Sequence, residues 1–191
     1  LSLTGNTGTV QWQQSADGST AWTNVTGGSG ATTTTYTTAA LTAATYYKAV
    51  VTNGSCVAAN SNTITVSINA LTAISTQPAI AATAYCQNGT ATALSVSATG
   101  TGLSYQWYSN TTASTTGATS ITNATSASYT PLTTAASAFY YYCVVSGTCG
   151  SVTSNFSGLQ TVSPTSVGGT ASTTANTICS GITTSLSLTG N

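Results

Sequence analysis

Residues 104–108 read SYQWY, and residues 140–145 read YYYCVV. In both stretches aromatic and β-branched side chains occur in the alternating pattern of half-buried strands. Other alternating stretches are LSVSA at residues 94–98 and ITVSI at residues 64–68, and clusters of Gly, Asn, Ser and Thr separate them as turns. Because Thr and Val lose side-chain freedom in helices, nothing here favours a helix. The sequence therefore predicts an all-β chain.

The two decisive stretches have counterparts earlier in the chain. Gln106-Trp107 matches Gln11-Trp12, and YYYCVV matches YYKAVV at residues 46–51. Over a longer distance, the hexapeptide LSLTGN occurs at residues 1–6 and again at residues 186–191. Similarity at a fixed period is the signature of repeat proteins. We expect a recurring unit that consists of two diverged copies of one domain.

The chain is almost free of charge. It has one lysine, Lys48, one acid, Asp17, and no histidine. Charged residues make up 1% of the chain, against roughly 25% in an average domain. The hydrophobic fraction is nevertheless 40% and the net charge is zero, whereas disordered chains combine low hydrophobicity with high net charge. We therefore expect folded domains with a neutral surface rich in hydroxyl groups.

The spacing of the aromatic residues resembles that of the immunoglobulin fold. In each copy a Trp on the third strand, Trp12 or Trp107, is followed by a Tyr two residues before a small core position, Tyr47 or Tyr141. The runs QWQQS and YYKAVVTNGSC further resemble immunoglobulin-like repeats of giant surface proteins of Bacteroidota, which include gliding-motility adhesins. The resemblance implies tandem immunoglobulin-like Greek-key β-sandwiches with these four aromatic residues in their cores. It also implies an extracellular, cell-surface protein.

The repeat register divides the chain into three parts. Residues 1–68 are expected to form an incomplete immunoglobulin-like domain whose first strands are missing, and residues 69–163 a complete one. Residues 164–191 are expected to be the opening strands of the next repeat. No apolar run approaches the roughly 18 residues of a membrane helix, and no stretch resembles a signal peptide. We interpret the chain as an excerpt of a longer exported protein.

The sequence lacks the residue types that catalysis requires. General acid–base and nucleophilic catalysis use His, carboxylates or an activated nucleophile, and this chain has one acid and no His. Metal and calcium sites need several such ligands. We expect no enzymatic activity, no cofactor and no metal. Without a basic patch, nucleic acid is not expected as a partner.

The five cysteines are expected to be crosslinks or core residues. Cys86 precedes the second strand of its domain and Cys149 follows the sixth, so a structural disulfide between them is predicted. The repeat register makes Cys179 the counterpart of Cys86 and Cys56 the counterpart of Cys149, so both should pair with cysteines outside this segment. Cys143 should be a buried, inert thiol.

Three aromatic residues are candidates for an interaction surface. Tyr140 and Tyr142 alternate with the inward-pointing Tyr141, so they should form an exposed stripe. Trp22 follows a turn and should be partly exposed. Single exposed aromatic residues are common on protein surfaces, and packing across strands explains Trp22 better than a sugar-binding platform does.

Together these features predict a structural stalk or filament segment of a large cell-surface adhesin. Its partners would be neighbouring repeats of the same protein, in a homo-oligomer or filament bundle, because uncharged edge strands favour lateral association. The alternative is a glycan-binding module with one site per repeat, which an exposed Trp-lined groove in both copies would support. A polymer formed by strand exchange between separate short chains is a third possibility, but LSLTGN would then supply one segment twice.

Overall fold

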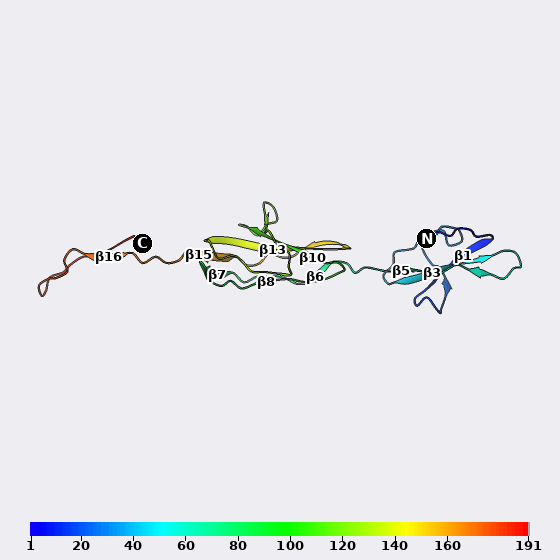
Figure 1. Cartoon of the computed structure of the whole chain (residues 1–191), viewed down its shortest axis with the longest axis horizontal. Helices are drawn as coiled ribbons and strands as arrows, with labels where there is room; N and C mark the ends of the chain where they lie inside the picture. Colours follow the sequence, from blue (N-terminus) through cyan, green and yellow to red (C-terminus); the bar gives the residue numbers. More distant parts are fainter. Residues whose placement is uncertain (191) are drawn as a thin grey trace. The chain divides into compact units, whose positions relative to one another are not determined.

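The computed structural model describes residues 1–190, which form strands and connecting loops (Figure 1). No helix occurs among these residues, so the prediction of an all-β chain is confirmed. The chain divides into two compact units, Leu1–Ala70 and Leu71–Asn191, where a boundary at 68/69 was expected.

The first unit is built on one antiparallel sheet. Its long strands β1 (Thr9–Ser15) and β3 (Thr45–Thr52) pair over seven positions, with Trp12 opposite Ala49. The alternating sequence points both of these side chains into the core, where each has at most 1% of its surface exposed. Shorter strands extend the sheet: β2 (Thr23–Asn24) on β1, and β4 (Ala59–Asn60) and β5 (Ile64–Val66) on β3.

A short stretch before β1 covers part of this sheet. The amide of Leu3 donates to the carbonyl of Thr34 at 2.8 Å, and the amide of Tyr36 donates to the carbonyl of Leu1 at 2.9 Å. The two leucine side chains pack against the buried cluster around Trp12. This stretch and residues 34–36 thus cover one side of the core of the first unit.

The second unit contains a larger sheet with the strand order β11-β10-β13-β15-β7, and β14 also pairs with β13. As in the first unit, two long strands form the centre of the sheet. They are β10 and β13, and Trp107 of β10 lies opposite Cys143 of β13. The strands of this sheet are β7 (Thr83–Cys86), β10 (Ser104–Asn110), β11 (Thr119–Ser120), β13 (Ser137–Gly147), β14 (Gly150–Thr153) and β15 (Gln160–Ser163).

Two further strand pairs form a second layer in this unit. They are β8 (Leu94–Ser95) with β12 (Ser128–Tyr129), and β6 (Ala73–Thr76) with β9 (Ser97–Thr99). Leu94 from this layer packs with Trp107 from the larger sheet in one buried cluster. Two layers around a shared core are the arrangement of a β-sandwich, and each fully buried large apolar side chain contributes about 1.5–3 kcal/mol to its stability.

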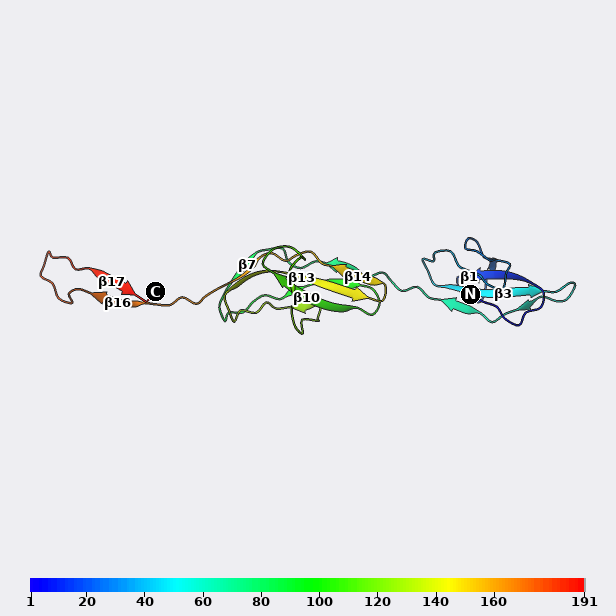
Figure 2. The same cartoon turned by 90° about the horizontal axis from the view of Figure 1, so that it is seen from above.

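The last two strands pair with each other. β16 (Thr170–Thr173) and β17 (Leu186–Thr189) form an antiparallel two-stranded sheet (Figure 2). All four residues of β17 are exposed. These strands lie within residues 164–191, where opening strands of a next repeat were expected.

The expected core aromatics are buried in both units. Trp12 and Tyr47 are 1% exposed, Trp107 is 0% exposed and Tyr141 is 5% exposed. The indole N–H of each tryptophan donates to a backbone carbonyl at 2.9 Å, so the polar edge of the ring is satisfied inside the core.

Two further tyrosines, the buried Tyr36 and the partly buried Tyr129, pack beside the core tryptophans. Tyr36 is 1% exposed and its ring centroid lies 6.3 Å from that of Trp12, while Tyr129 lies 6.1 Å from Trp107. Both are followed by Thr, in Tyr36-Thr37 and Tyr129-Thr130, and this recurrence in the two halves of the chain was the signal that could have identified them.

A serine is hydrogen-bonded to the second long strand of each unit in the same way. The amide of Cys143 donates to Oγ of Ser154 at 2.9 Å, and the amide of Ser154 donates back to the carbonyl of Cys143 at 2.8 Å. Ala49 and Ser61 make the same two bonds at 2.9 and 2.8 Å. The same two hydrogen bonds to a serine therefore occur in both sheets, although the strand residue that makes them is Ala49 in the first unit and Cys143 in the second.

Candidate functional site

The two core tryptophans are not accessible to a ligand. Trp12 and Trp107 have almost no exposed surface, and their N–H groups are already bound to the carbonyls of Thr33 and Ser126. A sugar ring cannot stack on either face. These residues therefore do not form the exposed groove that would have supported a glycan-binding module.

The prediction that Tyr142 is exposed is wrong. Tyr142 lies on the face of β13 opposite to Tyr141 and Cys143, but it is 5% exposed. Its ring stacks on Tyr108, with centroids 5.0 Å apart and 8° between the planes, and Phe156 meets it edge-on at 5.3 Å. Alternation correctly predicted the face of the sheet, but it could not predict that neighbouring rings cover this face.

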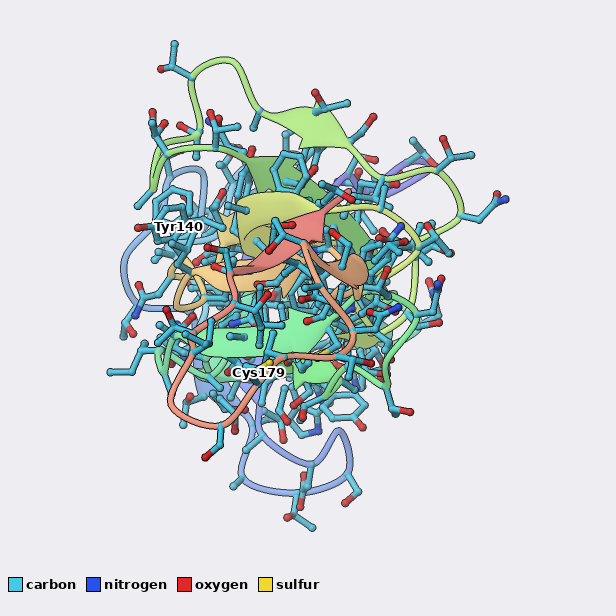
Figure 3. All side chains as sticks on the ribbon, turned by 90° about the vertical axis from the view of Figure 1, so that its left-hand side faces the viewer. Tyr140 and Cys179 are labelled. Carbon is cyan, nitrogen blue, oxygen red and sulfur yellow. The ribbon has the colours of Figure 1, made fainter. Side chains whose placement is uncertain are left out.

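Tyr140 is the more accessible member of the expected stripe. It is half-buried, lies opposite Asn110 in the β10–β13 pairing, and appears at the periphery of the view in Figure 3. Burial raises the pKa of the neighbouring Tyr142 phenol, and the nearby phenol of Tyr108 raises it further. The stripe thus consists of one accessible ring beside a packed aromatic cluster.

Trp22 in the first unit packs against the only lysine of the chain. The ammonium of Lys48 lies 4.5 Å from the centroid of the half-buried Trp22 ring, a cation–π contact. Strand pairing aligns Trp22, just before Thr23, with Ala118, just before Thr119, in the second unit. Because the tryptophan has no counterpart there, it is not part of a site that recurs in both units.

An open hollow of about 360 Å³ in the second unit has an aromatic lining that includes Tyr129, Phe139 and Tyr141. Leu132, which is 67% exposed, is part of the same lining. The volume is at the small end of the range for ligand pockets, roughly 300–1,000 Å³. In the first unit a hollow of the same volume at Gln14 is lined by small residues instead. The hollow at Gln14 in the first unit thus lacks the aromatic lining of the hollow in the second unit.

Asp17 holds the turn that follows β1. Its Oδ1 accepts hydrogen bonds from the amides of Ser19 and Thr20, at 2.9 and 2.8 Å, and from the hydroxyl of Ser15 at 2.8 Å. The hydroxyl of Thr20 donates to Oδ2. The Thr20 hydroxyl first, and then the backbone amides, hold the pKa of Asp17 well below its ordinary value. Such a carboxylate stabilises a turn and is a poor general acid.

The predicted disulfide between Cys86 and Cys149 is wrong. Cys86 has a free, exposed thiol. It pairs with Ser163 at the end of the parallel strands β7 and β15, and β15 runs antiparallel to β13, so Cys86 lies near the start of β13 at Ser137. Cys149 follows the other end of β13, after Gly147, roughly 30 Å away at 3.3 Å per residue.

This error has a topological cause. The sequence placed Cys86 before one strand and Cys149 after another, and the prediction assumed that these positions meet at one end of the sandwich. Because β7 runs antiparallel to β13, the two cysteines lie at opposite ends of the sheet. Cys56 and Cys179 are exposed, and Cys179 lies on the loop between β16 and β17 (Figure 3). Their pairing with cysteines outside this segment stays a prediction.

Cys143 is buried, as predicted. It has no exposed surface, and it packs in the cluster of Trp107 with Leu94 and Val96, the residues expected to face it. Burial raises the pKa of its thiol to about 11, although a backbone hydrogen bond from Gln106 acts in the opposite direction. Since the thiolate is the reactive form, this thiol is chemically inert near neutral pH.

Exposed apolar side chains are concentrated in the last part of the second unit. Leu186 is 80% exposed and Leu188 is 55% exposed, and both lie on the same face of β17 because they are two residues apart. Other large apolar residues with exposed fractions of 44–70% in this segment are Val167, Ile178 and Ile182. Leu186 and Leu188 thus form a small exposed apolar face on β17.

Within residues 1–190, no three His, Cys, Asp or Glu side chains come together in a way that could hold a metal ion. Nor does this part of the chain contain a helix of the length and hydropathy needed to cross a membrane.

A family model, described as a domain of unknown function (DUF8696), matches residues 1–70 and 76–163. A search of curated proteins finds no match. The matched residues cover the whole first unit and the second unit from the last residue of β6 to the end of β15, and the chain therefore belongs to the DUF8696 family.

Proposed function

We propose that this protein is a structural repeat of a long extracellular adhesin or surface filament, in which it acts as stalk and self-association surface. The observation that carries the proposal is that two units share one buried framework while their outer faces differ. Trp12 and Trp107 make equivalent indole bonds, and Ser61 and Ser154 make equivalent strand bonds. A framework that recurs with a variable surface is typical of tandem immunoglobulin-like repeats.

The composition supports a mechanical role. With one lysine and one acid, neighbouring copies do not repel one another electrostatically, and hydroxyl groups keep the surface hydrated at any salt concentration. The sequence has no histidine and only one acid, so no pair of carboxylates and no histidine base is present, and the proposed role is not enzymatic. The resemblance to giant surface proteins of Bacteroidota supports a location on the cell surface, and neighbouring repeats of the same protein are the proposed partners.

Labelling of intact cells tests the proposal. Antibodies raised against the purified chain should label the surface of cells that produce the protein without permeabilisation, and external protease should remove the signal. A periplasmic or cytosolic marker protein should stay protected in the same cells. Signal that appears only after permeabilisation would contradict an extracellular stalk.

The aromatic hollow of the second unit supports the alternative of a glycan-binding module. The half-buried rings of Tyr129 and Phe139 in its lining offer a surface on which a sugar ring can stack. A glycan array probed with the purified chain separates the two functions, because a stalk should bind no glycan. If binding is found, Leu132→Ser at the hollow should weaken it, whereas Ile80→Ser, at an exposed position outside this lining, should not.

A further inference from the structure

We propose that Asn53, in the hairpin between β3 and β4 of the first unit, is a site of spontaneous deamidation, whereas Asn88 in the second unit is protected from the same reaction. Each of these asparagines is followed by a glycine, and the sequence contains no other Asn-Gly pair. The inference goes beyond the proposed function and does not depend on it. It assigns a covalent modification to one residue and explains its rate by the local structure.

The reaction joins the side chain of an asparagine to the backbone nitrogen of the next residue. In the hairpin, the nitrogen of Gly54 loses its proton to hydroxide and attacks Cγ of Asn53, so that an N–Cγ bond forms. The Cγ–Nδ2 bond breaks, and ammonia leaves with a proton taken from water. Water then opens the resulting cyclic imide at either carbonyl and yields aspartate or isoaspartate. Glycine favours the attack because it has no Cβ beside the nitrogen.

The hairpin leaves the Asn53–Gly54 peptide open to this attack. Asn53 is exposed, and a Cβ added to Gly54 would meet no atom within 4 Å. The amide of Cys56 donates to the carbonyl of Asn53 at 3.1 Å and closes the turn. Within residues 1–190, the amide of Gly54 makes no backbone hydrogen bond of its own. Its proton is therefore accessible to hydroxide, and its nitrogen is free to move toward Cγ of Asn53.

The same dipeptide in the second unit is held by hydrogen bonds. The amide of Gly89, whose nitrogen would have to attack, donates to the carbonyl of Cys86 at 2.9 Å. The amide of Asn88 donates to the carbonyl of Thr133 at 2.8 Å, and the hydroxyl of Thr133 donates to the carbonyl of Gly89 at 2.6 Å. Asn88 is exposed, as Asn53 is. Because these bonds must break before the nitrogen reaches Cγ, the second unit protects its Asn-Gly pair.

Deamidation at Asn53 changes the charge of an almost uncharged chain. The sequence has one lysine and one acid, and its net charge is zero. A carboxylate at position 53 doubles the number of acids and makes the net charge negative. Isoaspartate also adds a methylene group to the backbone of the hairpin. Copies that have both reacted repel each other at low salt, so the surface of this unit changes with age and without an enzyme.

The corresponding hairpin of the second unit shows which substitution removes the site. After the two valines its sequence is Ser146-Gly147, where the first unit has Thr52-Asn53-Gly54. A serine before the glycine is therefore compatible with a hairpin at this position. Asn53→Ser removes the reactive amide and keeps the glycine, and Asn88→Ser is the matched variant at the protected pair.

Peptide mapping of the purified full chain tests the proposal. After incubation at mildly alkaline pH and digestion with chymotrypsin, mass spectrometry should find that Asn53 reacts about tenfold or more faster than Asn88, because the hydrogen bonds of Gly89 must break first. The rate at Asn53 should rise with pH, since hydroxide removes the amide proton. In concentrated urea both residues should react at similar rates, because unfolding removes the bonds that protect Asn88.

Isoelectric focusing gives an independent readout. An acidic form of the full chain should accumulate with time, Asn53→Ser should remove most of it, and Asn88→Ser should leave it unchanged. The proposal is overturned by equal rates at the two residues in the folded chain, or by an acidic form that persists in Asn53→Ser. It is also overturned if Asn53 reacts in urea but stays intact in the folded chain.

Discussion

Cys143 lies directly opposite Trp107 between β10 and β13, and Ala49 takes the equivalent place opposite Trp12. The first unit therefore shows that an alanine beside the tryptophan is compatible with this core. We expect Cys143→Ala to leave the fold intact and to lower the free energy of unfolding of the second unit by about 1–2 kcal/mol, since only the buried sulfur is lost. Urea denaturation checks this value, and loss of the folded state would contradict the equivalence.

The same substitution should change the response to alkaline pH. Burial raises the pKa of Cys143 from 9.0 to about 11, so the folded state holds its proton while the unfolded state releases it. Stability should therefore be constant below pH 9 and fall between pH 9 and about 11. Tyr141, whose pKa burial raises from 10.0 to about 12, contributes a further loss only above pH 10.

Thermal melts between pH 8 and pH 10 test this assignment. In Cys143→Ala, the pH at which stability begins to fall should move from about pH 9 to about pH 10, because only the buried tyrosines then remain to release protons on unfolding. An unchanged onset would show that another group causes the loss.

The serine that is hydrogen-bonded to the second long strand of each unit should contribute more to stability than a surface serine does. Ser154→Ala leaves the amide of the buried Cys143 without its Oγ acceptor, so we expect a loss of about 1–3 kcal/mol in the free energy of unfolding. Ser61→Ala should act in the same direction on the first unit. Ser151→Ala, which removes an exposed bond to Ser146, is the matched control and should cost less than about 0.5 kcal/mol. Equal effects of all three would argue against the shared framework.

Thiol labelling should separate the cysteines by burial. In the reduced, folded protein, Cys56, Cys86 and Cys179 are exposed and should react with a maleimide within minutes, whereas Cys143 should react only on unfolding. After gentle oxidation, peptide mapping should find no link between Cys86 and Cys149, because strand β13 separates them. Finding that link would show that the strand arrangement is wrong.

Stability should be insensitive to salt and to pH over a wide range. Asp17 keeps its charge in both folded and unfolded states from about pH 5 to pH 9, and almost nothing else titrates there. Because the folded-state pKa of Asp17 lies below its ordinary 3.8, its contribution is present above that pH and lost as the pH falls below it. Asp17→Asn should abolish this loss of stability in acid, and stability should remain constant between about pH 5 and pH 9. A melting temperature that changes strongly with salt, or with pH between about pH 5 and pH 9, would contradict a surface hydrated by hydroxyl groups.

Local patterns in the sequence were sufficient to predict the long strands and the four core aromatic residues Trp12, Trp107, Tyr47 and Tyr141. Alternation in SYQWY and YYYCVV predicts both the strands β10 and β13 and the inward faces of Trp107 and Tyr141, because side chains of a strand point to opposite faces in turn. The same rule placed Tyr142 on the outer face correctly. It gave no information on Tyr108 and Phe156, which come from other segments and bury Tyr142.

The sequence by itself thus determined the all-β class, the two Trp-centred cores and the inert Cys143, since each depends on the residue's own strand. Only the tertiary structure decided which segments meet. It separates Cys86 from Cys149 because strand direction, which no local pattern encodes, sets the end of the sheet at which a residue lies. It also leaves Leu186 and Leu188 in solvent, because burial depends on a facing layer and not on the hydrophobicity of the strand alone.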